Sequence, residues 1–383
     1  MTMTLPLRAA TGTVTAAVTT AQRTIAFEDR PEPVASPGTA VIKMHSVTLC
    51  GTDAHIWDDD YASELPIVQG HEASGTIVAL DPADAGSGFA VGDRVVICPM
   101  FYCGTCYACS VGRVNACSNM TVYGCYQDGS LTQRQAVPLA NLYRLPDSLS
   151  LDLAPLVEPI SIAMQACKRG RPVAGENVQI NGAGPIGLLA LAYLKDVGCN
   201  VSVTDMNPQR LDIATRFGAD RVFTVEGRFP TPAQAEEVAE WTNGNGPSLV
   251  IDATGVPASL AAAIDVVSTA GRVVCVGISD KPLTFDMRTL VTKEIDILGS
   301  RNSQNLFPEC IDLLERYQDM LATLITHRFG FHDLDAAFHA MADPGVGKIA
   351  IDFTESGSDL SGDVAAVSAA VSAAPADDEA GER

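Results

Sequence analysis

The sequence predicts an α/β protein in which a β-rich unit precedes a doubly wound parallel sheet. Two observations support this fold class. Up to about residue 98, short β-branched runs are separated by proline and glycine, as is typical of an all-β unit. From residue 177 onward, apolar runs alternate with helical stretches, which is the pattern of a parallel sheet with helices on its faces.

In the β-rich unit we expect strands at 14–18, 40–43, 74–80, 94–98, 129–137 and 142–145. A helix is expected to begin near Leu156, because Pro159 suits a first helical turn and apolar residues continue beyond it.

In the α/β unit we expect strands at 177–180, 201–205, 222–225, 249–252, 272–277 and 295–299, with helices at 232–241 and 258–268 between them. Helices at 305–317 and 334–341 then precede a last strand at 348–353. Beyond residue 354, Ser, Gly, Ala and Asp dominate, so we expect a disordered acidic tail over 355–383.

A glycine-rich turn links the first two strands of the α/β unit. Gly182, Gly184 and Gly187 follow a strand and open a helix, which allows a tight turn and a close approach of backbone N–H groups to a pyrophosphate. Asp205 ends the next strand, where an acid accepts hydrogen bonds from ribose hydroxyls and repels a 2′-phosphate. The pattern therefore favours NAD over NADP. Asp205 is alternatively a helix N-cap, a role that Asn207 fills equally well.

Composition excludes several classes of function. The 383 residues carry a net charge of -21, whereas a nucleic-acid partner needs clustered Lys and Arg. No apolar run approaches ~20 residues, so no membrane span is expected. No signal peptide is recognisable, and eleven cysteines, several in C-x-x-C spacing, indicate metal ligands in a reducing compartment. We therefore expect a cytoplasmic protein.

A first metal site is predicted from Cys50, His71 and Glu72, residue types that zinc accepts, at a separation typical of ligands on neighbouring loops. Each alone is more often structural, but they occur together ahead of a dinucleotide fold. Glu158, at the expected start of a helix, is a further ligand candidate. Its alternative role is that of a surface acid favoured by the helix dipole.

A second metal site is predicted from four closely spaced cysteines: Cys103, Cys106, Cys109 and Cys117. Four thiolates form a closed tetrahedral site, so we expect a structural zinc that holds a lobe at about 98–120. An iron–sulfur cluster uses the same ligands but gives no reason for a hydride-transfer fold to follow. The other cysteines outside both sites are expected to pack in the core.

Four motifs occur in a specific order: Cys-Gly-Thr-Asp-Ala-His at 50–55, Gly-His-Glu at 70–72, the four cysteines, and Gly-Ala-Gly-Pro-Ile-Gly at 182–187. With them the sequence resembles the zinc-dependent medium-chain alcohol and polyol dehydrogenases over about residues 12–353. The resemblance implies a GroES-like catalytic domain formed by 1–158 and 300–354, a Rossmann domain at 159–299, and a homotetramer or homodimer. It also implies two zinc ions per subunit and NAD.

The resemblance also implies roles for individual residues. Cys50 and His71 match the catalytic zinc ligands, and Glu158 falls where simple alcohol dehydrogenases have Cys. Sorbitol and threonine dehydrogenases have Glu there, and in them Glu72 ligates zinc while Glu158 acts directly or through water. The choice between the two acids stays open.

Further residues match the proton relay and the cofactor site. Thr52 and His55 match the family's relay from substrate through the nicotinamide ribose to solvent, and Arg210 matches the position beside the adenine. The expected cofactor-binding residues are Gly182, Gly184, Pro185, Ile186, Gly187, Asp205, Arg210, Thr254 and Gly277.

We therefore expect an enzyme that oxidises a secondary alcohol of a small polyol or sugar acid to the ketone. Zinc acts as a Lewis acid and NAD accepts the hydride. Arg301 and Asn302 are candidate substrate residues, because an arginine binds a carboxylate in bidentate fashion. The alternatives are an L-threonine 3-dehydrogenase-like or butanediol-type enzyme and, in another class, a catalytically silent nucleotide-binding relative.

Overall fold

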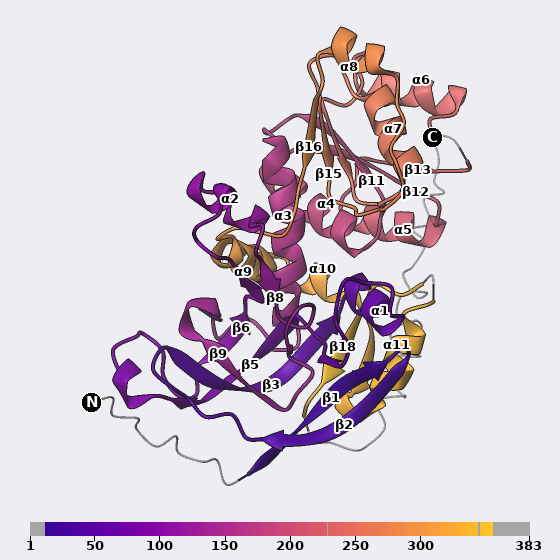
Figure 1. Cartoon of the computed structure of the whole chain (residues 1–383). Coiled ribbons are helices and arrows are strands. Elements are labelled where there is room, and N and C mark those ends of the chain that lie inside the picture. The colour runs from indigo at the N-terminus through magenta and orange to yellow at the C-terminus, as the bar shows by residue number, and fades with distance from the viewer. Residues whose placement is uncertain (1–11, 228, 344, 355–383) are drawn as a thin grey trace, which may run out of the picture.

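The computed structural model describes residues 12–227, 229–343 and 345–354, which form a β-rich domain and an α/β domain (Figure 1). The expected acidic tail at 355–383 lies outside these residues. Within the described part of the chain, no helix is both long and apolar enough to cross a bilayer.

The β-rich domain is built on a mixed sheet with strand order β10-β6-β5-β3-β18-β17, in which β9 also pairs with β3. A smaller sheet has the order β2-β1-β4. The strands of the first half of the chain are β1 (Thr13–Ala21), β2 (Thr24–Pro31), β3 (Thr39–Leu49), β4 (Ile67–Val68), β5 (Glu72–Leu80), β6 (Arg94–Ile97), β9 (Arg134–Pro138) and β10 (Leu142–Arg144).

Alternation of side chains explains the core of this domain. In β3, Ala40, Ile42 and Met44 are at most 2% exposed and pack in one apolar cluster with residues of β1 and β5. The strand β2 was not predicted, because its sequence Thr-Ile-Ala-Phe-Glu-Asp-Arg-Pro is largely exposed at a sheet edge and lacks a buried face.

The C-terminal part of the chain returns to the β-rich domain. Strand β18 (Lys348–Asp352) pairs antiparallel with β3 and parallel with β17 (Ile325–Gly330). Figure 1 shows β18 and helix α11 (Leu334–Ala340) beside the N-terminal strands. Strand β17 was not predicted, because its residues are only partly buried and follow no apolar alternation.

The α/β domain contains a parallel sheet with strand order β13-β12-β11-β14-β15-β16. This order and the alternating helices confirm the predicted Rossmann fold. The strands are β11 (Asn177–Asn181), β12 (Asn200–Asp205), β13 (Arg221–Thr224), β14 (Leu249–Asp252), β15 (Arg272–Cys275) and β16 (Asp296–Gly299), each within a few residues of its predicted run.

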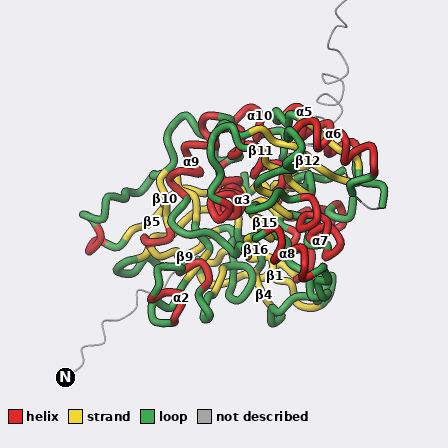
Figure 2. Tube along the Cα trace, turned by 90° about the horizontal axis from the view of Figure 1, so that it is seen from above, coloured by secondary structure: helices red, strands yellow, loops and turns green. Residues whose placement is uncertain are grey.

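Helices cover both faces of this sheet. Leu249 and Ile251 pack in a cluster with α3 and α4, whereas Val250 packs with α7 and α8 on the other face. Figure 2 shows α3 and the pair α7 and α8 on opposite sides of β15 and β16. The helices are α3 (Val157–Gly170), α4 (Pro185–Val197), α5 (Pro208–Arg216), α6 (Pro232–Trp241), α7 (Pro257–Val266) and α8 (Met287–Lys293).

Short elements complete the chain. A lobe formed by β7 (Met100–Phe101), α2 (Tyr107–Ser110) and β8 (Thr121–Val122) projects between the domains, and α9 (Phe307–Arg316) packs against α3 (Figure 1). Helix α10 (Gln318–Ala322) follows α9, and α1 (Gly51–Trp57) follows β3.

Close packing of α4 against the glycine turn requires the absence of a side chain at Gly187. A Cβ atom there would lie 1.8 Å from the carbonyl oxygen of Gly182. At Gly184, by contrast, no atom lies within 4 Å of an added Cβ, and φ is negative.

We therefore expect Gly187→Ala to lower the free energy of unfolding by about 1–3 kcal/mol or more, because the helix must move away from the strand. Gly184→Ala is the matched control and should unfold like the wild type without ligand. Urea unfolding of the two variants checks this, and equal stabilities would contradict the packing argument.

Candidate active site

A thiol, an imidazole and a carboxylate meet where β3 and β5 pair. Cys50 follows β3 and precedes α1, His71 immediately precedes β5, and Glu72 is the first residue of β5. Antiparallel pairing places Thr48 opposite Glu72. One ligand atom each of Cys50, His71 and Glu72 lies within 4.8 Å of the others. This donor set is one that zinc accepts, so the residues fit the predicted metal.

Asp53 holds together the two loops that carry these residues. Its Oδ2 accepts a hydrogen bond from the Cys50 N–H group (2.9 Å), and its Oδ1 accepts one from the Gly70 N–H group (3.3 Å). The side chain is fully buried, and this burial raises the pKa of the Asp53 carboxyl. Asp53 therefore fixes the spacing between Cys50 and His71.

Glu72 is neutralised by a lysine from the last strand. The ammonium group of Lys348 donates to Oε1 of Glu72, and the hydroxyl of Thr48 donates to Oε2. Lys348 also donates to the carbonyl oxygen of Leu49 (3.2 Å). Although burial alone would lower the pKa of Lys348, the Glu72 carboxylate reverses the effect and raises it. Glu72 is thus oriented from two sides, as metal-ligating carboxylates commonly are.

Glu158 lies nearby, in the first turn of α3, and is 6% exposed. Within the described part of the chain, no group donates a hydrogen bond to its carboxylate. Burial, and then the charge of Glu72, raise the pKa of Glu158 to about 7. Its side chain therefore gains and loses a proton near neutral pH.

His71 is held through its Nδ1 atom. This atom lies 3.7 Å from Oδ1 of Asp53 and 3.8 Å from Sγ of Cys125. Burial acts to lower the pKa of His71, but Asp53 and Cys125 outweigh it, and the pKa is raised well above its usual value. A metal ion that binds this imidazole must displace a proton.

The predicted relay residues lie on α1. Thr52 Oγ1 is 3.9 Å from the Cys50 sulfur. His55 follows three residues later, on the same helix face as Thr52, and is exposed. Its Nδ1 lies 2.8 Å from Oδ1 of Asp60, a partner that sequence reasoning missed.

The four lobe cysteines form a second candidate metal site. Their sulfurs lie within 4.8 Å of one another. Hydrogen bonds from the Thr105 backbone and hydroxyl lower the pKa of Cys103 to about 5, which favours the thiolate that zinc requires. The set is Cys103, Cys106, Cys109 and Cys117.

A cavity of about 1060 Å³ opens at the carboxyl ends of β11 and β12. Among the predicted cofactor residues, Gly182, Asp205, Arg210 and Thr254 line it. Asp205 accepts hydrogen bonds from the backbone N–H groups of Ala183 (2.7 Å) and of Asn207. The N-cap of α5 is Asn207, so the alternative role of Asp205 as that cap is wrong.

The other predicted cofactor residues do not line this cavity. Gly184 and Pro185 line a smaller crevice between α4 and the 345–347 segment. Gly277 packs on the backbone of Gly255, where a Cβ atom would lie 2.1 Å from the Gly255 nitrogen. Ile186 and Gly187 lie on the wall of neither cavity, and Gly187 acts through helix packing.

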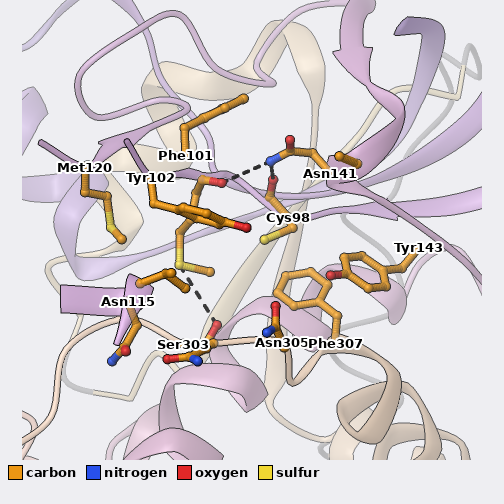
Figure 3. A pocket seen from close by; sticks show the side chains of 14 residues that line it. Cys98, Phe101, Tyr102, Asn115, Met120, Asn141, Tyr143, Ser303, Asn305 and Phe307 are labelled. Atoms are coloured by element: carbon orange, nitrogen blue, oxygen red, sulfur yellow. Dashed lines mark hydrogen bonds between the residues drawn. The ribbon is translucent and has the colours of Figure 1, made fainter. Parts of the chain in front are cut away.

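The candidate substrate residues lie beside the lobe. The carbonyl oxygen of Arg301 accepts a hydrogen bond from the Asn115 amide (2.8 Å), and the Asn302 amide contacts the Met120 sulfur. The next residues line a pocket of about 250 Å³. In Figure 3, Ser303 and Asn305 face Cys98 across this pocket.

Sequence reasoning missed Asp53, Asp60, Cys125 and Lys348. A local signal exists only for Asp53. It stands three residues after Cys50, the N-cap of α1, and an acid at that position is typical of a capping box. Lys348 meets Glu72 across 276 residues, and no local pattern indicates that pairing.

Comparison with known families and proteins gives consistent results. A model described as "Alcohol dehydrogenase GroES-like domain" matches residues 36–147, and one described as "Zinc-binding dehydrogenase" matches residues 185–316. Sorbitol dehydrogenase of Gallus gallus is 34% identical over 86% of this chain and 94% of its own. L-threonine 3-dehydrogenase of Burkholderia ambifaria (strain MC40-6) is 32% identical over 84% and 94%.

Among solved structures, the RspB alcohol dehydrogenase of E. coli CFT073 in complex with NADH superimposes with a TM-score of 0.81. It is 32% identical, and the match covers 89% of this chain and all of that one.

The burial of Glu158 generates a pH-dependent prediction for the metal-free protein. Between its usual pKa of 4.5 and its raised value of about 7, the folded state holds a proton that the unfolded state has lost. The stability that this proton contributes is present below pH 4.5 and is lost as pH rises through 7. In the chelator-treated protein, the free energy of unfolding of Glu158→Gln relative to that of the wild type should therefore be higher at pH 8 than at pH 5, by up to about 3 kcal/mol.

Urea unfolding of both proteins at both pH values measures this difference, and other titrating groups cancel in the comparison. A gap between variant and wild type that is the same at pH 5 and pH 8 would rule out a raised Glu158 pKa.

Proposed function

Because the chain belongs to the zinc-dependent medium-chain alcohol and polyol dehydrogenase family, we propose that it oxidises a secondary alcohol of a polyol or sugar acid to the ketone, with zinc and NAD. The observation that carries the proposal is the cluster of Cys50, His71 and Glu72, the last two of them buried, beside the buried carboxyl group of Glu158. Buried acids with a raised pKa are concentrated at functional sites, which supports a catalytic site over a purely structural one.

We assign Cys50, His71 and Glu72 as the protein ligands of the catalytic zinc. Proximity supports Glu72 over Glu158, because the ligand atoms of the first three lie within 4.8 Å of one another. The hydrogen bonds from Lys348 and Thr48 orient the Glu72 carboxylate and leave lone pairs free. Glu158 has no such partners and serves the reacting groups instead.

When bound, zinc with three protein ligands supplies Lewis acidity that lowers the pKa of a substrate hydroxyl. The nicotinamide ring accepts the hydride. The residues of the chain handle the proton. We assign Glu158 to accept or return a proton within the site, because its carboxyl group is buried beside the cluster and receives no hydrogen bond among the described residues. Thr52 and His55 carry the proton toward solvent, and Asp60 holds the His55 ring by its Nδ1 atom.

The cofactor preference rests on Asp205. Its carboxylate lines the large cavity at the end of β12 and carries a negative charge where a 2′-phosphate would lie. Arg210 also lines this cavity, which suits a contact with the adenosine half of NAD.

We assign the preference for an acidic substrate to Arg301, whose backbone lies beside the lobe. Its side chain is exposed and forms no ion pair with a carboxylate in the described ranges. Threonine-like and butanediol-type substrates remain the competing classes within this family. We also propose a homodimer or homotetramer, because β16 is a sheet edge with Ile297 exposed, and Met287 and Val291 are exposed on α8. The proposed compartment is the cytoplasm, because the cysteine spacing is typical of metal ligands in a reducing compartment.

A substrate panel tests the activity. We expect the zinc-loaded protein to form NADH, measured at about 340 nm, with sugar acids or polyols rather than with threonine or butanediol, and a chelator to abolish turnover. Failure of all substrates in a protein that holds two zinc ions would favour the catalytically silent relative.

Matched variants locate the chemistry. Cys50→Ala and Glu72→Gln should retain only the lobe zinc, whereas Glu158→Gln should retain two zinc ions while its turnover falls about 100-fold. Loss of zinc from Glu158→Gln but not from Glu72→Gln would reverse the ligand assignment.

A substitution at Asp205 tests the cofactor preference. Asp205→Ala removes hydrogen bonds to the ribose and a repulsive charge, so discrimination between NAD and NADP should fall about 10–100-fold. The ratio of kcat/KM for the two cofactors measures it, with thermal melting as the control for folding. An unchanged ratio would refute the ribose role of Asp205.

A further inference from the structure

A second thiol lies behind the imidazole of the catalytic site. Cys125 is 5% exposed and packs with Ile56 and Ile67 in a small apolar cluster. Its Sγ lies 3.8 Å from Nδ1 of His71. No motif in the sequence singled out this cysteine, and the proposed mechanism does not use it.

Backbone contacts between glycines place Cys125 there. A Cβ atom at Gly124 would lie 2.6 Å from the carbonyl oxygen of Gly70, and one at Gly129 would lie 2.3 Å from the same atom. The N–H groups of Gly129 and Ser130 donate to the carbonyls of Val68 and Gly70. The 124–130 segment is thus bound directly against the residue that precedes His71, which fixes the backbone of Cys125 relative to His71.

Cys125 is also tied down on its other side. The hydroxyl of Ser63 donates to the Cys125 carbonyl oxygen (2.5 Å), and the Cys125 N–H group donates to the carbonyl of Val122 (3.2 Å). These bonds hold the residue independently of His71.

The Nδ1–H group of a metal-bound histidine needs an acceptor that fixes the ring. Asp53 is the obvious candidate, but its Oδ1 lies 3.7 Å from Nδ1, beyond an N–H···O hydrogen bond. Asp53 is already engaged by the N–H groups of Cys50 and Gly70. Sulfur is larger than oxygen, so 3.8 Å is still within reach of a weak N–H···S hydrogen bond.

We infer that Cys125 is a positioning residue for the catalytic metal. Its sulfur accepts a hydrogen bond from Nδ1–H of His71 and so presents Nε2 of the ring to the metal. The inference rests on the proposed zinc site. It adds that a neutral thiol, and not a carboxylate alone, orients this ligand.

Two variants at position 125 separate this role from packing. Cys125→Val keeps the apolar contacts with Ile56 and Ile67 but offers no acceptor, whereas Cys125→Ser restores one. In chelator competition, Cys125→Val should lose the catalytic zinc at about 10–100-fold lower chelator concentration, and Cys125→Ser should stay closer to the wild type. The lobe zinc should be retained in both, which shows that the protein is folded.

A spectroscopic readout complements the metal titration. With cobalt(II) in the catalytic site, the visible d–d bands should shift in Cys125→Val and return toward the wild type in Cys125→Ser. Cys199→Ser is the matched control, because Cys199 is also buried but lies in the α/β domain, with its sulfur 3.4 Å from the Val173 carbonyl oxygen. It should leave both readouts unchanged.

The outcomes are distinguishable. If the wild type binds only one zinc, the proposed function itself fails. If the wild type binds two, and Cys125→Val matches it in chelator competition and in cobalt spectrum, then Cys125 is merely a packing residue and the inference is overturned.

Discussion

The candidate active site depends on the neutralisation of a buried carboxylate by a lysine from the opposite end of the chain. Glu72 is fully buried and Lys348 is 4% exposed, so each charge is tolerated only because the other is present. Removing one partner of such a pair typically costs about 3–5 kcal/mol, because the remaining charge is left unpaired. This pair also explains why β18 must return to β3: the last strand brings the cation to the metal site.

Close contact between glycine backbones determines how the loop that carries His71 is placed. Gly70 immediately precedes His71 and turns the chain with a φ of 90°. The 124–130 segment packs against the carbonyl oxygen of Gly70. Asp53 binds the same glycine from the side of α1. Hydrogen bonds between backbone groups and buried side chains therefore hold the two loops that carry Cys50 and His71. These two candidate ligands are thus oriented before a metal ion binds.

Glu158 connects the site to the rest of the molecule. It lies in the first turn of α3, and Ser161, on the next turn, is hydrogen-bonded to Ser303 (2.8 Å). The 301–304 segment is bound in turn to the lobe, through Asn115 and through the Gln304 amide, which donates to the Gly112 carbonyl. The four-cysteine lobe thus supports, through this segment, the helix that carries Glu158.

The sequence by itself determined the fold class, the glycine turn and both groups of metal-ligand types, because these depend on local spacing: strand and helix periodicity, and cysteines a few residues apart. It did not determine which acid lies nearer to Cys50 and His71, nor the roles of Asp60, Cys125 and Lys348. Most of these roles depend on contacts between residues that lie tens to hundreds of positions apart in the sequence. Such contacts give Glu72 its lysine partner, whereas Glu158 is buried without a hydrogen-bond donor and its pKa is raised.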